Sequence, residues 1–270
     1  MNRPLLIVDD VSVQYHGSGM RAVDGAGFSL DTGETLGIIG ESGAGKSTLA
    51  LALLGLVDPD AALVSGSVRL ANRELLGISD KELCRIRGRE AGMIFQDPVG
   101  SLDPVRRIDD QVAEAIRIHS RVRRSEALAA ARAELAGVGI GADILAVSPY
   151  PHQLSGGLCQ RVMIAAAVAA APSLLIADEP TSSLDMTLQS QIITLLKEKQ
   201  RLSGMALIFI THDLMLVAKI ADRIAVMKDG QIVEQGQRAA VLDNPVHPYT
   251  RELLAAWPLA PRGGIAVAPA

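Results

Sequence analysis

Gly40-Glu41-Ser42-Gly43-Ala44-Gly45-Lys46-Ser47-Thr48 decides the fold of this chain, because it follows the pattern G-x-x-x-x-G-K-[ST] of a phosphate-binding loop, or P-loop. The apolar segment 35–39 before it predicts a buried strand, and segment 49–54 after it predicts a helix. Glycines let the backbone curl so that N–H groups point at a phosphate, and the helix adds the positive end of its dipole. Lys46 can then reach the β- and γ-phosphates of a nucleotide, and the Ser47 hydroxyl can ligate Mg²⁺.

The composition is that of a globular protein with a substantial core. The 270 residues suffice for one large or two small domains, and 49% of them are hydrophobic. Aromatic residues make up only 3%, so Ala, Leu, Val and Ile must fill the core. A net charge of −4 argues against a protein that binds nucleic acid through electrostatic attraction. The 2 cysteines, Cys84 and Cys159, lack the spacing of metal ligands, and they predict a reducing compartment without structural disulfides.

The sequence predicts no direct insertion into a membrane. The N-terminal apolar run is too short for a signal peptide. The longest apolar runs elsewhere, 162–171 and 206–210, are far shorter than the roughly 20 residues of a transmembrane helix. We therefore expect a soluble protein, for which any role at a membrane comes through a partner.

Short apolar segments alternate with helical patterns along most of the chain, which predicts a mostly parallel sheet covered on both faces. Polar residues follow the carboxyl ends of these strands, where open α/β sheets bind ligands. The predicted strands are an edge strand at 5–13, then 26–30, 35–39, 67–70, 93–96, 174–177, 206–210 and a hairpin over 224–234. The predicted helices are 79–86, 108–136, 155–171 and 188–202. The helical stretch from 97 to 172 has the pattern of an insertion between two strands of one nucleotide-binding fold.

Two acids follow the apolar segment 174–177. Asp178 can organise Mg²⁺, directly or through water, and Glu179 can take a proton from an attacking water. Two solvated acids in a loop are common in proteins and need not be functional. Their place after a buried strand and downstream of a P-loop favours the catalytic interpretation.

The segment Leu154-Ser155-Gly156-Gly157-Leu158-Cys159-Gln160-Arg161 predicts a second phosphate-directed helix end. Ser155 can cap a helix, and the two glycines leave its first N–H groups accessible to an anion. The segment could simply start a helix. One chain with one P-loop has little use for a second such site, however, so we expect this helix end to complete the site of another copy or of a partner.

These motifs together resemble the ATPase subunits of ABC transporters. The P-loop (Walker A), Gln96, the Ser155 signature, Asp178 and Glu179 (Walker B), the segment 183–185 and His212 occur in the order seen in that family, over residues 5–258. The resemblance implies an α/β P-loop NTPase fold, that is, an ABC-type nucleotide-binding domain. It also implies an N-terminal antiparallel β-subdomain, a helical subdomain inserted at about 97–172, an ATPase domain over 1–258 and a short tail over 244–270.

The resemblance assigns roles to individual residues, with ATP and Mg²⁺ as the cofactors. Tyr15 would stack on adenine, although a half-buried tyrosine at a strand end is an ordinary alternative. Gln96 would touch Mg²⁺ or the attacking water, and His212 would bond the γ-phosphate and hold Glu179 in position. The nucleotide-binding residues of the P-loop would be Gly40, Glu41, Ser42, Gly43, Ala44, Gly45, Lys46, Ser47 and Thr48, with Ser47, Gln96 and Asp178 at the metal.

The resemblance also implies a second ATPase subunit. Ser155, Gly156 and Gly157 would bind the γ-phosphate held by the opposing subunit, and Asp185 would lie across that interface. Small departures from the family pattern remove no phosphate donor and no acid, so they indicate no inactive site: Ala44, Cys159 and Ser183.

Two segments resemble the oligopeptide, dipeptide and nickel importer group: 95–104 and the tail 244–254, which contains His247-Pro248-Tyr249-Thr250. Such a subunit would lie at the cytoplasmic face of the inner or plasma membrane, beside two transmembrane permeases. It would pair with a homologous ATPase. An extracytoplasmic solute-binding protein would deliver the solute to the permeases, and no nucleic acid would be bound. The resemblance implies an ATP-hydrolysing subunit that powers import of di- or oligopeptides or a related solute, with nickel or a metal–metallophore complex as the alternative cargo. The tail has no cysteine cluster, so no iron–sulfur centre is expected, and its shortness points somewhat toward the alternative without deciding it.

Two further interpretations remain open. A non-transport ABC ATPase acting on ribosomes or DNA usually carries two cassettes or a long coiled-coil insert, which this sequence lacks. A subunit that binds ATP without hydrolysing it would lack Glu179 or His212, and both are present. The arginines concentrated between 85 and 124 predict a solvated face, or else a contact with a permease loop.

Overall fold

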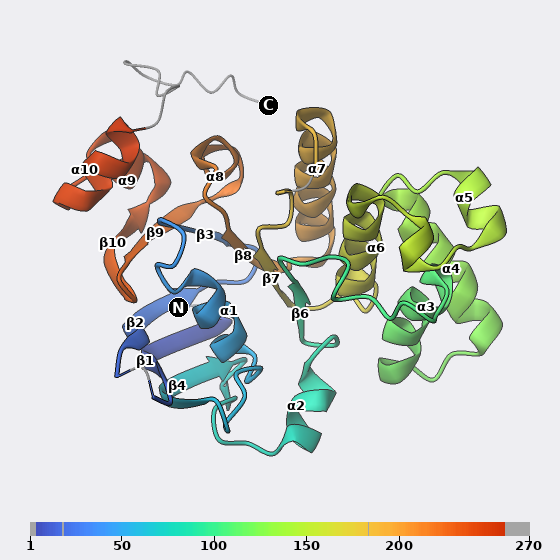
Figure 1. Ribbon diagram of the computed structural model, residues 1–270, viewed down its shortest axis with the longest axis horizontal. Helices are drawn as coiled ribbons and strands as arrows, with labels where there is room; N and C mark the ends of the chain where they lie inside the picture. Colours follow the sequence, from blue (N-terminus) through green and yellow to red (C-terminus); the bar gives the residue numbers. More distant parts are fainter. Residues whose placement is uncertain (1–3, 18, 183, 257–270) are drawn as a thin grey trace.

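The computed structural model describes residues 4–256 apart from 18 and 183, so Ser183, which departs from the family pattern, and the tail beyond 256 lie outside the described residues. A six-stranded sheet forms the centre of the molecule, with the order β10-β9-β3-β8-β7-β6 (Figure 1). Its strands pair in parallel except β10, which closes an antiparallel hairpin with β9. The strands are β3 (Thr35–Ile39), β6 (Ala91–Ile94), β7 (Leu174–Asp178), β8 (Ala206–Ile210), β9 (Arg223–Lys228) and β10 (Gln231–Gln237).

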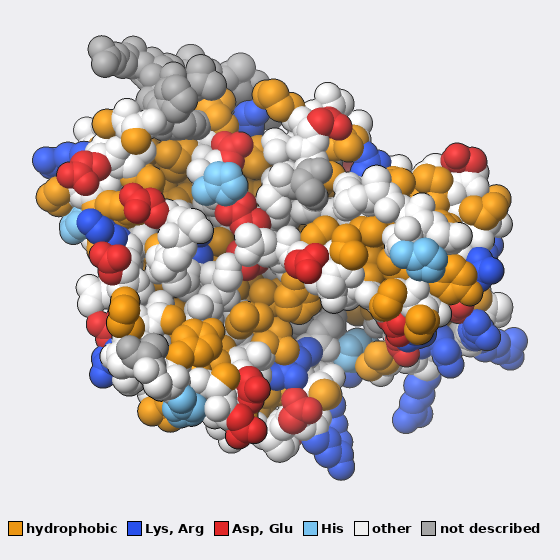
Figure 2. All heavy atoms as spheres, viewed as in Figure 1, with side chains coloured by type: hydrophobic (Ala, Val, Ile, Leu, Met, Phe, Trp, Pro, Cys, Tyr) orange, Lys and Arg blue, Asp and Glu red, His pale blue; other side chains and the backbone are white. Residues whose placement is uncertain are grey.

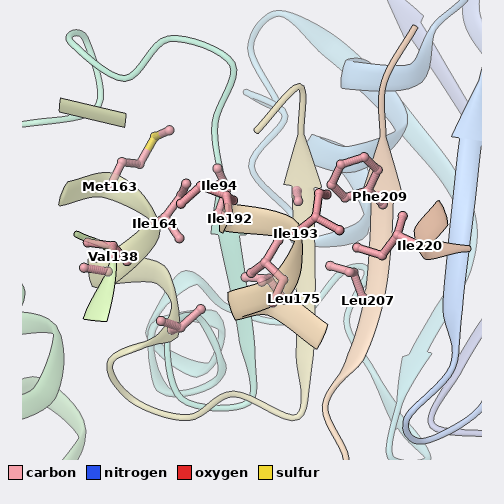
Figure 3. Packing of buried hydrophobic residues seen from close by; sticks show 14 of the residues in the cluster. Ile94, Val138, Met163, Ile164, Leu175, Ile192, Ile193, Leu207, Phe209 and Ile220 are labelled. Carbon is pink, nitrogen blue, oxygen red and sulfur yellow. The ribbon is translucent and has the colours of Figure 1, made fainter. Parts of the chain in front are cut away.

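The predicted parallel sheet is therefore confirmed, and its sequence explains why it is central. Every residue of β3, β7 and β8 is buried, as expected for strands that are covered on both faces. Figure 3 shows side chains of β7 and β8 packed against Ile192 and Ile193 of α7 (Met186–Ser203) and Ile220 of α8 (Leu214–Ile220). Since these strands are rigidly held, the loops that follow their carboxyl ends have fixed starting points.

A second, antiparallel sheet lies beside the first, in the order β2-β1-β4-β5 (Figure 1). It consists of β1 (Leu6–Tyr15), β2 (Arg21–Leu30), β4 (Ala62–Leu70) and β5 (Arg73–Glu74). The predicted N-terminal antiparallel subdomain is confirmed, but the prediction that 5–13 is an edge strand was wrong. The strand β1 pairs with β2 on one side and with β4 on the other, because its alternating side chains bury one face in the core between these neighbours.

The segment between β6 and β7 is helical and lies to one side of the central sheet (Figure 1). The helical stretch predicted over 108–136 is two helices, with a break that begins at Ser120, where the backbone is extended. The break lets buried side chains of both helices, such as Val112 and Ala131, meet in one core, which a single straight helix could not do. The helices of this segment are α3 (Ile108–His119), α4 (Arg124–Gly137), α5 (Ala142–Val147) and α6 (Gly156–Val168), with a 3₁₀ turn at Pro151–Gln153.

The other helices flank the two sheets. Helix α1 follows the P-loop as predicted, α2 corresponds to the helix predicted over 79–86, and α7 to the one predicted over 188–202. The sequence interpretation did not include α5, α8 or α9, which are short. These remaining helices are α1 (Lys46–Leu53), α2 (Asp80–Ile86), α9 (Arg238–Asp243) and α10 (Pro248–Ala255).

The arginines between 85 and 124 contribute to a charged side of the molecule. Figure 2 shows Lys and Arg side chains gathered at the lower right, where Figure 1 places α3 and α4. Several of them are paired locally: Arg124 with Asp110 at 2.8 Å, and Arg106 with Glu114. Such pairs are typical of a solvated helix surface.

Candidate functional site

The P-loop connects β3 to α1. At two of its glycines, the surrounding backbone leaves no room for a side chain. Gly40 has a φ of 154°, and a Cβ atom there would lie 2.2 Å from the carbonyl oxygen of Met227. Gly45 has a φ of 96°, and a Cβ atom there would lie 2.1 Å from the carbonyl oxygen of Ala22. Neither φ nor contact suits an L side chain, so these two glycines are needed for the curl of the loop.

The Lys46 side chain is held by hydrogen bonds to the P-loop backbone. Its ammonium donates to the carbonyl oxygens of Gly40 and Glu41, both at 2.8 Å, and the residue is 8% exposed. Burial lowers the pKa of Lys46, while the nearby carboxylates of Glu179 and Asp178 act in the opposite direction. An ammonium has three donors, so the third N–H of Lys46 remains available for a phosphate oxygen.

Asp178 is the last residue of β7 and is 3% exposed. Its Oδ1 atom is buried and has no hydrogen-bond partner among the described residues, while the Ser47 hydroxyl bonds to the carboxylate. Burial raises the pKa of Asp178, which the bond from Ser47 partly offsets. A buried carboxylate oxygen without a partner, beside a hydroxyl, is a donor set that fits Mg²⁺, which favours oxygen ligands and commonly keeps only one or two from the protein.

Glu179 follows Asp178 and has a backbone conformation that is unusual for a residue other than glycine. Its φ is 50°, in the left-handed region, and its N–H donates to the carbonyl oxygen of Ile210 at 2.9 Å. Strain of this kind persists where the surrounding structure fixes it, often at functional sites. Here it turns the Glu179 carboxylate toward the loop that follows β8.

That loop carries His212, which makes two contacts with the same carboxylate oxygen. The backbone N–H of His212 donates to Glu179 Oε1 at 3.1 Å, and the ring Nδ1 of His212 lies 2.8 Å from the same oxygen. The Glu179 residue is 8% exposed, whereas the His212 side chain is 72% exposed. The imidazole therefore holds the acid with one nitrogen and leaves Nε2 for another partner.

One pocket of about 570 Å³ joins these groups at the carboxyl ends of β3, β7 and β8. Most of the residues predicted for nucleotide, metal and catalysis line it: Ser42, Gly43, Gly45, Lys46, Ser47, Thr48, Gln96, Asp178, Glu179 and His212. Gly40, Glu41 and Ala44 shape the loop behind it. The pocket is thus able to hold a phosphate chain between a cation and two acids.

Five predicted site residues outside the P-loop do not line this pocket. Tyr15 ends β1 and is partly exposed. Ser155 caps α6, accepting from the N–H of Leu158 at 3.4 Å, and the signature around Gly156 lies on the surface. Asp185 caps α7 by accepting from two backbone N–H groups, each at 3.0 Å. The fifth is Gly157, in the first turn of α6.

The sequence interpretation missed three residues at the site. Ala22 and Ser182 line the pocket, the latter donating from its hydroxyl to the carbonyl oxygen of Glu179 at 3.2 Å. Tyr249 contacts the P-loop, because its hydroxyl accepts from the N–H of Glu41 at 3.1 Å. For Ser182 the signal was its place three residues after Glu179, whereas nothing local in the sequence places Tyr249 beside residue 41.

We expect Asp178→Asn to abolish ATP turnover and yet to stabilise the nucleotide-free chain by about 1 kcal/mol at neutral pH, because it removes the charge from a buried side chain whose Oδ1 atom has no hydrogen-bond partner among the described residues. The raised pKa of Asp178 fixes the sign of the pH dependence. Burying the protonated form of Asp178 costs the folded state little free energy. The cost of burying the charged form develops as the pH rises toward the folded-state pKa. The extra stability of the variant should therefore vanish in acid.

Denaturant unfolding at neutral and acid pH measures this difference. Asp60→Asn, which makes the same change at an exposed position, is the control. It should leave ATP turnover and the free energy of unfolding unchanged. An Asp178→Asn chain that is less stable than the wild type at neutral pH would contradict the prediction.

No helix in the described part of the chain, residues 4–256 without 18 and 183, has both the length and the apolar character needed to cross a bilayer. The same residues contain no cluster of three or more His, Cys, Asp or Glu side chains that could bind a metal by themselves.

Known proteins resemble this chain over most of its length. Residues 23–182 match the protein-family model described as "ABC transporter". The Dipeptide transport ATP-binding protein DppD of Escherichia coli (strain K12) is 47% identical over 256 residues, which cover 94% of this chain and 78% of DppD. The Glutathione import ATP-binding protein GsiA of Salmonella choleraesuis is 46% identical over 265 residues. These cover 95% of this chain but only 42% of GsiA, so the chain spans less than half the length of that relative.

A solved structure agrees with these relatives. The ATP-binding cassette MJ0796, determined as a dimer in a post-hydrolysis state bound to ADP and Pi, superposes with a TM-score of 0.79 and 28% identity. The superposition covers 86% of this chain and 98% of MJ0796. With its P-loop pocket, its fold and these relatives, the chain belongs to the ABC transporter family.

Proposed function

We propose that this chain is the ATP-hydrolysing subunit of an importer for di- or oligopeptides. The observation that carries the proposal is the pocket in which the P-loop meets Asp178, Glu179 and His212. A cation, a metal-binding acid and a candidate base around one phosphate-sized space are what phosphoryl transfer to water requires.

The P-loop binds the phosphates of ATP. Its backbone N–H groups and the dipole of α1 face the phosphate chain, and the third N–H of Lys46 reaches the β- and γ-phosphates. Ser47, Asp178 and Gln96 line the pocket and would hold a Mg²⁺ ion, whose positive charge would offset the charge of the phosphates. Tyr15, at the end of β1, stacks on the adenine ring.

Glu179 acts as the general base. Its carboxylate takes a proton from the water that attacks the γ-phosphate, so that ADP and inorganic phosphate are formed. The two contacts of His212 with Glu179 Oε1 hold the carboxylate in one orientation, and Nε2 of the same ring bonds the γ-phosphate. Gln96 lies where it can contact the attacking water or the metal.

A second ATPase subunit completes the site. Ser155, Gly156 and Gly157 are at the surface end of α6, outside the pocket of their own chain. A head-to-tail pair would place this helix end against the γ-phosphate bound by the other subunit, with Asp185 across the interface. The dimeric form of the related cassette MJ0796 supports the pairing of two such subunits. We infer that the partner is a homologous ATPase.

The remaining partners follow from the family. We infer two transmembrane permeases, which ATP-driven closure of the ATPase pair would switch, and an extracytoplasmic solute-binding protein that delivers the cargo. The ATPase lies at the cytoplasmic face of the membrane, since it must meet both ATP and the permeases. The name of DppD, which assigns dipeptide transport to that relative, supports a peptide as the cargo.

Uptake by cells that lack this chain tests the proposal. We expect the loss of labelled di- or oligopeptide uptake, restored by the intact chain but not by Lys46→Ala. Loss of nickel uptake alone would assign the subunit to the nickel or metallophore alternative. If neither uptake changed, while translation or DNA metabolism did, the non-transport alternative would replace the proposal.

A further inference from the structure

The C-terminal segment 244–255 makes a contact with the P-loop that its sequence motif does not explain. Tyr249, the third residue of His247-Pro248-Tyr249-Thr250, is 5% exposed and lies in the core around the central sheet. Its hydroxyl oxygen accepts from the N–H of Glu41 at 3.1 Å. The two residues are 208 positions apart in the sequence, and the contact joins helix α10 to the first turn of the loop.

The Tyr249 side chain is fixed in place by its surroundings. Glu234 of β10 accepts from the backbone N–H groups of Val246 and His247, at 2.8 and 3.0 Å, and so ties the start of the segment to the hairpin. His247 then caps α10 by accepting from the Tyr249 N–H at 3.2 Å. The ammonium of Lys228 lies 4.6 Å from the centroid of the Tyr249 ring, on its face.

The same peptide unit connects Tyr249 to Lys46. The Gly40–Glu41 peptide carries the N–H that donates to Tyr249 and also the Gly40 carbonyl that accepts from Lys46 Nζ at 2.8 Å. In a trans peptide these two groups point in opposite directions. Tyr249 therefore holds one side of the peptide plane, and the Lys46 ammonium is held at the other side.

We propose that Tyr249 is a positioning residue of the nucleotide site, which fixes the Gly40–Glu41 peptide so that Lys46 is directed at the β- and γ-phosphates. The inference rests on the proposed function, since it assumes that the P-loop binds ATP. Without the hydroxyl, the peptide can rotate and the Gly40 carbonyl no longer restricts Lys46. The nucleotide should then be bound less tightly through its β- and γ-phosphates, while Glu179 and His212, on other loops, keep their contact.

Tyr249→Phe isolates the hydroxyl, because the ring and its contact with Lys228 remain. Loss of one hydrogen bond of ordinary strength corresponds to about a fivefold change in an equilibrium constant. We expect the full chain to bind ATP and ADP about fivefold more weakly and to bind AMP, which has no β-phosphate, as well as the wild type does. In the assembled importer, KM for ATP should rise with kcat within about twofold of the wild type.

The matched control is Tyr150→Phe, which makes the same change at the residue before the 3₁₀ turn Pro151–Gln153, outside the P-loop pocket. Affinity for ATP within twofold of the wild type, an equal loss for AMP, a fall in kcat at constant KM, or the same effect in Tyr150→Phe would each overturn the inference. If the wild-type chain itself failed to bind ATP, the proposed function would fall instead. Thermal unfolding of the nucleotide-free variants checks that Tyr249→Phe is folded.

Discussion

Glu179→Gln is expected to lower the rate of ATP hydrolysis by about 100-fold or more and to leave ATP affinity within about twofold of the wild type. A positioned general base contributes on the order of 10²–10⁴ to a rate, and an amide cannot accept the proton of the attacking water. The amide oxygen can still accept from the N–H of His212, so the loop after β8 should keep its position. The change therefore separates catalysis from binding.

Phosphate release and equilibrium ATP binding by the same preparation measure the two effects. Glu198→Gln, on the exposed face of α7, is the matched control and should behave as the wild type does. Turnover that is unchanged in Glu179→Gln would remove Glu179 from its proposed role. A loss of ATP affinity equal to the loss of turnover would mean that Glu179 binds the nucleotide and does not act as the general base.

Lys46→Ala is expected to weaken ATP binding by about 100-fold. Hydrogen bonds from a charged donor to phosphate oxygens contribute roughly 1.5–3 kcal/mol each, and the upper value alone corresponds to slightly more than a factor of 100. Because the Lys46 ammonium is already buried and held by two P-loop carbonyls, the phosphates gain this contact without a large rearrangement.

Competition with a fluorescent nucleotide checks the prediction, with Lys81→Ala on the exposed side of α2 as the control. AMP should bind the wild type and Lys46→Ala equally well, because Lys46 is directed at the β- and γ-phosphates. An Lys46→Ala chain with undiminished ATP affinity would show that the nucleotide lies elsewhere.

The local motifs of the site could be predicted from the sequence because each one is contiguous. The P-loop, the acids after β7 and the histidine after β8 all follow buried apolar strands, and parallel strands bring such ends to one edge. The pocket accordingly contains Lys46, Asp178, Glu179 and His212, as the sequence interpretation expected.

What the sequence could not provide depends on contacts between distant segments. Alternation in 5–13 is the same for an edge strand and for a central one, so only the pairing with β4 shows that β1 is central. The break after His119 depends on the packing of α3 against α4. Tyr249 reaches Glu41 because the hairpin β9–β10 and Glu234 bring helix α10 back to the P-loop.

The most direct measurement follows phosphate release and peptide accumulation in the same sample of liposomes that contain the whole importer, with ATP on the side of this chain. With the wild-type chain, we predict that a labelled dipeptide accumulates as phosphate is released. With Glu179→Gln, both rates should fall together by about 100-fold or more. Peptide accumulation that continues at the wild-type rate after phosphate release has been lost would contradict the proposal that hydrolysis in this pocket powers import.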